Sequence, residues 1–104
     1  KEMNFEWDES KNKINIRKHD LDFFDAWEVF QNPMLIETDN RHDYGEFRFL
    51  AIGILRDLVV LLVFTERDND IIRVISLRRA LKYERDKFFK YLQNELGTPA
   101  DDVG

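Results

Sequence analysis

Cysteine is absent from this sequence of 104 residues, and histidine occurs only twice, as His19 and His42. Without thiols the chain can form neither disulfides nor thiolate metal sites, a composition typical of proteins from the reducing cytoplasm. The two histidines lie outside any H-x-x-x-H or H-E-x-x-H pattern that would bind zinc. We therefore expect a cytoplasmic protein that needs no metal and no cofactor.

Glycine and proline are scarce as well, with four and two residues. The sequence has no glycine-rich phosphate loop and no G-x-S-x-G motif, so NTP hydrolysis, hydride transfer and catalysis by a serine elbow find no support. The longest apolar run covers only residues 58–64, whereas a membrane-spanning helix needs about 20 residues. No basic-then-apolar pattern typical of a signal peptide opens the sequence. We expect no contact with a membrane.

Apolar residues are plentiful, at 43% of the sequence. This length and composition predict one domain over residues 1–104 with a packed core, and a flexible polar tail at residues 97–104. Nine phenylalanines and two tryptophans can exceed what a small core hides. Either the core is rich in phenylalanine, or an apolar patch stays exposed for a partner protein to cover.

Charge is distributed unevenly along the chain. The net charge of −5 argues against indiscriminate binding of nucleic acid. Residues 66–90, however, contain eight lysines and arginines against five acidic residues. This segment predicts a local basic face, and in its later, helical part we favour solvated ion pairs at i,i+4 spacing.

The first third of the sequence predicts one short strand and two helices. Residues 4–7 suit a strand, and residues 9–18 a polar helix capped by Asp8 and anchored by Ile14. Residues 23–31 suit a second helix capped by Asp22, with Phe23, Ala26, Trp27 and Phe30 as its apolar positions.

The rest of the sequence predicts four strands joined by short turns, and then a helix. The strands cover residues 34–39, 46–55, 58–67 and 71–77, and the helix covers residues 78–96 and ends at Gly97. Short turns favour antiparallel hairpins. We therefore predict an α+β fold: a mainly antiparallel four-stranded sheet plus a short N-terminal strand, two N-terminal helices and a C-terminal helix.

Arginines gather near the ends of the predicted strands. Arg67 closes one strand, Arg73 lies within the next, and Arg78 and Arg79 stand where that strand meets the last helix. A guanidinium group suits a phosphodiester because it stays charged and forms paired hydrogen bonds. RNA supplies its own nucleophile, the 2′-OH, so a ribonuclease needs only a base, an acid and cations for the transition state. The composition permits this chemistry without a metal.

Three blocks of sequence, in order, resemble the BrnT toxin family, the toxin half of a type II toxin–antitoxin pair. FEWDESKNKINIRKHDLDFFDAWEVF (residues 5–30) resembles the opening of the family. DNRHDYGEFRFLAIGIL (residues 39–55) resembles its D-x-R-x-x-x-G-E-x-R block, and VVLLVFTERDNDIIRVISLRRALKYER (residues 59–85) resembles its close. Three blocks at the right spacing form a specific pattern.

The resemblance implies a RelE-like fold and a ribonuclease that slows translation. It also implies neutralisation by a cognate antitoxin, typically a ribbon-helix-helix protein through which the complex binds operator DNA. Two alternatives remain open. The fold could serve as a non-catalytic binding module that acts through the antitoxin complex. The second alternative is a metal hydrolase that uses His19 and carboxylates.

The matching positions nominate nine site residues. The catalytic candidates are Lys11, His19, Glu46, Arg67, Arg79 and Glu84, and the candidates for RNA binding are Trp7, Arg73 and Arg78. Each candidate also has a structural interpretation. Trp7 suits a core position, and Lys11 suits a solvated helix face rather than a phosphate contact. His19 is either an acid or base that titrates near neutral pH or a structural histidine.

The strand residues carry the same ambiguity. Glu46 is either a general base or the partner of Arg41 or Arg48 in a salt bridge at a strand edge. Arg67 matches the T-x-R element of the family, and for it we favour phosphate binding over a solvent-facing strand end. Arg73 either contacts RNA or pairs with a neighbouring acid on the sheet.

Arg78 and Arg79 match the S-x-R-R-A element, and Glu84 follows in the matching E-R pair. One arginine can hold the helix start against the sheet while the other binds phosphate. Cations at a helix N-terminus oppose the helix dipole, which favours an anion at this position. Glu84 either acts on RNA or clamps Arg79 or Arg73.

Overall fold

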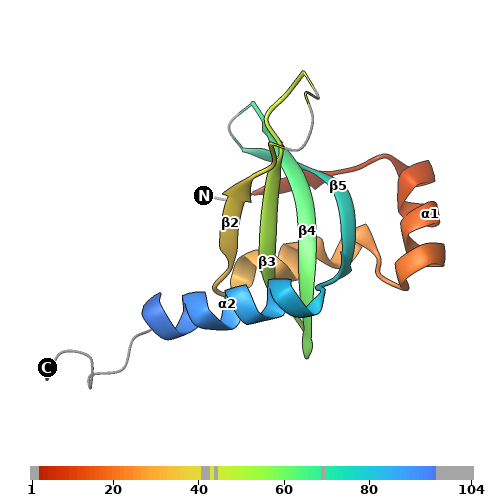
Figure 1. Ribbon diagram of the computed structural model, residues 1–104. Coiled ribbons are helices and arrows are strands. Elements are labelled where there is room, and N and C mark those ends of the chain that lie inside the picture. Colours follow the sequence, from red (N-terminus) through yellow and green to blue (C-terminus); the bar gives the residue numbers. More distant parts are fainter. Residues whose placement is uncertain (1–2, 41–42, 44, 69, 96–104) are drawn as a thin grey trace, which may run out of the picture.

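The computed structural model describes residues 3–40, 43, 45–68 and 70–95. Within them the chain forms five strands and three helices (Figure 1). They are β1 (Asn4–Glu6), α1 (Glu9–His19), η1 (Phe23–Gln31), β2 (Leu35–Thr38), β3 (Phe49–Leu55), β4 (Leu58–Arg67), β5 (Ile71–Arg79) and α2 (Lys82–Glu95). The predicted tail, the helix end at Gly97, and the residues Arg41 and His42 lie outside the described residues.

The strands form one sheet in the order β1-β5-β4-β3-β2. β1 pairs with β5 in parallel, and every other neighbouring pair is antiparallel. This arrangement confirms the predicted α+β class and the mostly antiparallel sheet. The RelE-like relationship stays a prediction. No helix in the described part of the chain is long and apolar enough to cross a bilayer.

Two predicted boundaries near the candidate site are wrong. β3 begins at Phe49, so Glu46 lies in the preceding loop and not at the start of the strand. β5 continues to Arg79, because Arg78 and Arg79 pair with Leu61 and Val60 in the antiparallel ladder. The two arginines therefore end a strand, and the expected conflict with the dipole of the last helix does not arise.

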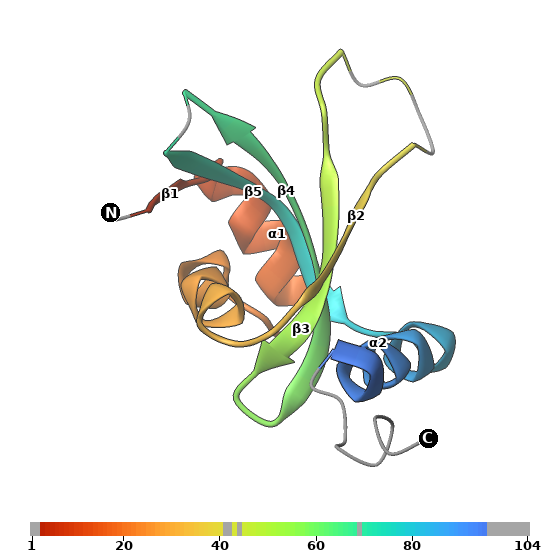
Figure 2. The same ribbon diagram turned by 90° about the vertical axis from the view of Figure 1, so that its left-hand side faces the viewer.

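The two faces of the sheet are covered by different helices (Figure 2). η1 packs on one face, where Phe23, Ala26 and Val29 are buried against strand residues. α2 crosses the other face through the fully buried Phe88. η1 is a 3-10 helix with three residues per turn, so every third side chain lies on one face. The predicted α-helical stripe was therefore partly wrong, and Trp27 is 45% exposed.

Polar contacts, and not apolar ones, attach α1 to the sheet. The predicted anchor Ile14 is 50% exposed, while Asn12 and Asn15 are buried. β1 pairs only with Ile71–Arg73 of β5, so the remaining edge of β5 has no neighbouring strand there. The Asn15 side chain takes that place: it donates to the Leu77 carbonyl at 2.8 Å and accepts from the Leu77 N–H at 3.2 Å. The expected N-caps, Asp8 and Asp22, are both confirmed.

Candidate functional site

A cavity of about 450 Å³ opens where the end of α1, the end of β5 and the start of α2 meet. We call it the cationic cavity. Its lining consists of Lys18, His19, Arg78, Arg79 and Leu81. Three of the nine predicted site residues, His19, Arg78 and Arg79, thus share one cavity although they come from distant parts of the sequence.

Asn15 explains how these residues meet. His19 follows Asn15 by four residues, so the two lie on the same face of α1. Because Asn15 is hydrogen-bonded to Leu77, the last turn of α1 lies beside the next residues of β5, Arg78 and Arg79. A second hydrogen bond, from Asn15 to the Leu21 carbonyl at 2.9 Å, fixes the chain after α1. The side-chain amide therefore sets the geometry of the cavity.

Arg78 is held in place by Glu84. Its two terminal nitrogens donate to the two carboxylate oxygens of Glu84, each at 2.9 Å. The same carboxylate accepts from the Leu81 N–H at 2.7 Å, as a glutamate in the first turn of a capped helix does. The predicted clamp thus exists, but its partner is Arg78 and not Arg79 or Arg73.

The Glu84 carboxylate is charged at neutral pH. Burial raises its pKa, but hydrogen bonds from Arg78 and Leu81 outweigh burial and hold the pKa below the ordinary 4.5. A carboxylate already occupied by three donors is poorly suited to take a proton from a substrate. Its geometry suits the orientation of Arg78.

Arg79 and Lys18 supply the uncompensated charge of the cavity. Within the described residues, neither side chain has a carboxylate partner. Since Glu84 neutralises Arg78, these two cations leave the cavity with an excess of positive charge. Such a cavity fits an anion, and guanidinium and ammonium groups are the usual ligands of phosphate.

His19 is kept neutral by its surroundings. Burial, the positive charge of Lys18 and the positive charge of Arg78 together lower the pKa of His19 from its ordinary 6.5. At pH 7 the imidazole is therefore mostly unprotonated and can accept a proton. An anion bound among the cations would oppose the two electrostatic effects and raise this pKa.

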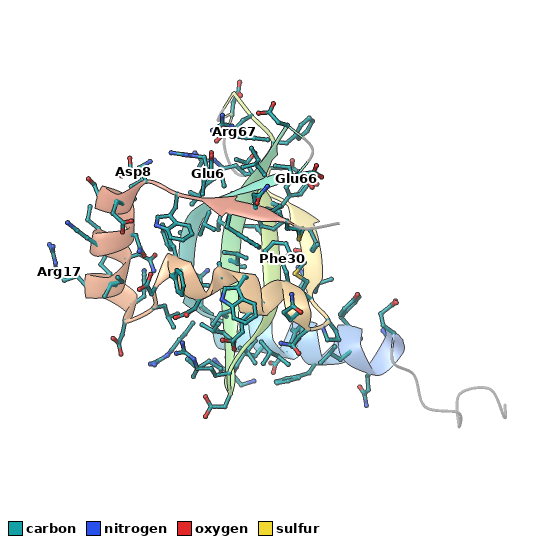
Figure 3. All side chains as sticks on the ribbon, turned by 180° about the vertical axis from the view of Figure 1, so that it is seen from behind. Glu6, Asp8, Arg17, Phe30, Glu66 and Arg67 are labelled. Atoms are coloured by element: carbon teal, nitrogen blue, oxygen red, sulfur yellow. The ribbon has the colours of Figure 1, made fainter. Side chains whose placement is uncertain are left out.

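Arg67 and Arg73 lie elsewhere. Both donate to one carboxylate oxygen of Glu6 on β1, which agrees with the structural interpretation of Arg73 (Figure 3 labels Glu6 and Arg67). Val60 pairs with Arg79, and Arg67 is seven residues further along β4, which places the two arginines about 23 Å apart at the usual strand rise. They cannot contact the same phosphate.

The remaining candidates are also outside the cationic cavity. Glu46 pairs with Arg48 at 3.2 Å, as one structural interpretation expected. Lys11 lies on the exposed side of α1, which fits a solvated lysine. Trp7 is half-buried, and its indole N–H donates to Glu9 at 3.3 Å. These contacts do not test whether the three residues touch RNA.

Trp7 lines a different hollow, which we call the aromatic groove. It measures about 570 Å³ and lies between β1 and η1. Six apolar side chains and one amide line it: Met3, Phe5, Trp7, Phe24, Trp27, Phe30 and Gln31.

Two polar residues that build the cationic cavity, and the apolar Leu81 in its lining, were not among the predicted ones. Lys18 stands directly before His19 in the matching K-H pair, and Asn15 occupies the asparagine position of the same block. The sequence signal was therefore present. Helical spacing alone does not show that an asparagine, and not the nearby Ile14, faces the sheet. In the described part of the chain, no group of three histidine or carboxylate side chains could hold a metal ion.

The chain resembles known proteins both in sequence and in structure. The family model for BrnT, the ribonuclease toxin of type II toxin–antitoxin systems, matches residues 7–84. The 1.1 Å crystal structure of the Brucella abortus ribonuclease toxin BrnT is similar to this chain, with a TM-score of 0.59 and 31% identity. The match covers 76% of this chain and 97% of the Brucella chain. No curated protein sequence gives a significant match. This chain belongs to the BrnT family of ribonuclease toxins of type II toxin–antitoxin systems.

Proposed function

We propose that this protein is an RNA endonuclease whose active site is the cationic cavity. The observation that carries the proposal is the meeting in one cavity of a neutral histidine, a clamped arginine and two cations that have no carboxylate partner among the described residues. Metal-free cleavage of RNA needs a base beside the 2′-OH and cations around the phosphorus, and this cavity offers both.

The reaction proposed is an internal transfer. The 2′-oxygen attacks the adjacent phosphorus and forms a new O–P bond, while the bond from phosphorus to the 5′-oxygen breaks. Neutral His19 accepts the 2′-OH proton, and a proton from Lys18 or from solvent reaches the leaving 5′-oxygen. Arg79 and Arg78 stabilise the charge on the phosphorane-like transition state. The products are a 2′,3′-cyclic phosphate and a 5′-OH end.

The other nominated residues take supporting roles in this proposal. Glu84 positions Arg78 and exchanges no proton with the substrate. Arg67 and Arg73 pair with Glu6 and lie too far along the ladder from Arg79 to contact the scissile phosphate, so their role is to hold β1 beside β4 and β5. Trp7, Lys11 and Glu46 have no place at the reacting atoms.

The biological part of the proposal follows from membership of the family. Cleavage of RNA slows translation in the cytoplasm, and a cognate antitoxin neutralises the toxin. A ribbon-helix-helix antitoxin would carry the complex to operator DNA. The order of strands and helices is compatible with a RelE-like fold, which we retain as part of the proposal.

The first experiment is cleavage of purified RNA by the isolated, folded protein in EDTA. We expect fragments with 5′-OH and 2′,3′-cyclic phosphate ends, and none from RNA that is 2′-O-methylated throughout. Cleavage that needs an added divalent metal, or fragments with 5′-phosphate ends, would contradict the mechanism. If the folded protein binds its antitoxin tightly but cleaves no RNA, either free or on ribosomes, the non-catalytic binding module becomes the better description.

A further inference from the structure

The aromatic groove lies in a part of the molecule that the proposed reaction does not use. Phe24, Trp27 and Phe30 are three residues apart, and η1 has three residues per turn, so they form one row along the helix. Phe24 is 65% exposed and Trp27 is 45% exposed. The row that η1 buries instead consists of Phe23, Ala26 and Val29. The geometry of the helix therefore presents Phe23, Ala26 and Val29 to the sheet and leaves Phe24 and Trp27 at the surface.

The apolar surface extends beyond this groove. A second hollow of about 200 Å³ shares Met3 and Phe30 with the groove and continues to Ile36 on β2, which is 46% exposed. Figure 3 looks onto this side of the molecule and shows Phe30 between β1 and η1. Contiguous apolar surface of this kind on a small protein marks a site of interaction.

The charges beside the groove select the partner. Six of the seven lining residues come from two segments, residues 4–9 and 23–31. Together these segments contain five carboxylates and no lysine or arginine. Arg67 and Arg73 neutralise Glu6, and the Arg56 guanidinium pairs with Asp25, while Glu28 accepts from Arg56 only the backbone N–H. Even so, carboxylates remain in excess beside the groove.

This pattern opposes RNA and self-association. A base stacked on Trp27 would bring its phosphates toward carboxylates, and two copies of the chain would place acidic rims against each other. A polypeptide segment with apolar side chains flanked by lysine or arginine satisfies both the groove and its rim. The cationic cavity, at the junction of α1, β5 and α2, has the opposite character.

We propose that the aromatic groove is the docking surface for an amphipathic, cationic segment of the antitoxin. The inference rests on the proposed function only in that the partner is the antitoxin. It adds that docking occurs apart from the cationic cavity, so binding of the antitoxin and cleavage of RNA depend on different residues. Phe24 and Trp27 are the anchors, and Glu9, next to Trp7, contributes to the acidic rim.

The test measures binding of the antitoxin encoded with this toxin and, separately, cleavage of RNA. Phe24→Ala and Trp27→Ala remove the exposed row, and Phe89→Ala removes a 51% exposed phenylalanine from α2 as the matched control. We expect each groove variant to weaken antitoxin binding about tenfold or more, as for a central aromatic anchor, and the control to leave it unchanged. RNA cleavage by all three free variants should equal that of the unmodified protein.

A second pair of variants tests the rim. Glu9→Gln keeps the hydrogen-bond acceptor for Trp7 but removes its charge, and Glu95→Gln makes the same change at the end of α2. We expect Glu9→Gln to slow association with the antitoxin at low salt, with little effect at high salt, and Glu95→Gln to do neither. Circular dichroism and urea unfolding show whether each variant is folded.

Three results would overturn the inference. The first is unchanged antitoxin affinity in folded Phe24→Ala and Trp27→Ala variants. The second is loss of RNA cleavage by these variants with antitoxin binding intact, which would identify the groove as an RNA contact. The third is a dimer of the free chain that dissociates into monomers when Phe24→Ala or Trp27→Ala is introduced. Failure of the proposed nuclease function has a different signature, since the unmodified protein would then bind antitoxin at the groove but cleave no RNA.

Discussion

Arg78 and Arg79 are neighbours in sequence but differ in what they can offer a substrate. Both terminal nitrogens of Arg78 donate to Glu84, and one of them also donates to the Arg79 carbonyl at 3.0 Å. Arg79 is exposed and has no carboxylate partner within the described residues. The free guanidinium can reorganise around a transition state, whereas the clamped one is fixed before the substrate arrives. Removal of Arg78 would leave the buried carboxylate of Glu84 without its partner, whereas removal of Arg79 breaks no ion pair among the described residues.

Substitution of Arg79 should therefore damage catalysis and leave the fold intact. We expect Arg79→Ala to lower kcat for RNA cleavage by about 100- to 1000-fold, the usual loss for a preorganised group that stabilises transition-state charge. Arg67→Ala is the matched control, because Arg67 lies at the opposite end of the β4–β5 ladder and pairs with Glu6. An equal loss in both variants, with urea unfolding unchanged, would show that the reacting phosphate is not bound in the cationic cavity.

His19 should report the occupancy of the cavity through its pKa. Burial and then the charges of Lys18 and Arg78 lower this pKa from 6.5, so Lys18→Gln should raise it. Inorganic phosphate should raise it too, by adding negative charge beside the imidazole. NMR titration of the imidazole protons measures both effects, and a His42→Gln variant assigns the resonance. A pKa at or above 6.5 in the free protein would remove the argument for His19 as a base.

The lowered pKa also predicts the direction of a stability change. At a pH well above 6.5 His19 is neutral in both the folded and the unfolded chain, so it contributes no pH dependence there. As pH falls below 6.5, the unfolded chain binds a proton that folded His19 resists, and the folded state loses stability until the pH passes the folded pKa. We expect His19→Gln to remove this part of the pH dependence of the free energy of unfolding, measured with urea.

At the level of elements, one side-chain amide, that of Asn15, joins α1 to β5. Asn15→Ala would leave the buried N–H and carbonyl of Leu77 without partners, as well as the Leu21 carbonyl. We expect a loss of about 3 kcal/mol or more in the free energy of unfolding, since three groups lose a partner and each unpaired buried group costs roughly 1–3 kcal/mol. Asn94→Ala, at an exposed position of α2, should change it by less than about 0.5 kcal/mol.

Urea unfolding of the two variants, with RNA cleavage measured below the unfolding transition, separates stability from function. Asn15→Ala should also cleave RNA slowly while still folded, because His19 loses its fixed position beside Arg78. Full cleavage activity in a destabilised Asn15→Ala protein would mean that the last turn of α1 is held by other contacts.

Hydrophobic period predicted the order of the elements but not their finer geometry. In η1, Phe23 and Ala26 fit both a helix with 3.0 residues per turn and one with 3.6, and the two diverge only at the third contact, Val29 or Phe30. β5 was predicted too short because Arg78 and Arg79 are as compatible with a helix start as with a strand end. Pairing with β4 decides between them, and pairing is a long-range property.

The candidate site was predictable in part. The family motifs nominated His19, Arg78 and Arg79, which the fold does bring together. The separation of Arg67 from Arg79 was also accessible, because residues that end two strands of an antiparallel hairpin lie at opposite ends of it. The partner of Glu84 was not predictable from the sequence. It depends on where the chain leaves β5, at Arg79, and where α2 begins, at Lys82.

Over the whole molecule, charge and apolar surface are segregated. The cationic cavity lies at the junction of α1, β5 and α2, and the aromatic groove lies between β1 and η1 beside an excess of carboxylates. With a net charge of −5, the protein as a whole repels RNA beyond the cavity. A few local cations must therefore supply all the electrostatic attraction, and the number of phosphates contacted should be small.

This small number can be counted from the salt dependence of binding. The uncompensated cations of the cavity are Lys18 and Arg79. Two phosphate contacts to single-stranded RNA predict a slope of log K against log salt near about −1.4. The probe is a 2′-O-methyl oligoribonucleotide, which cannot supply the nucleophile, measured by fluorescence anisotropy between about 50 and 200 mM salt. Arg79→Gln and Lys18→Gln should each reduce the slope by about 0.7, and Lys90→Gln on α2 should not change it. A slope unaffected by Arg79→Gln and Lys18→Gln would show that RNA binds outside the cationic cavity.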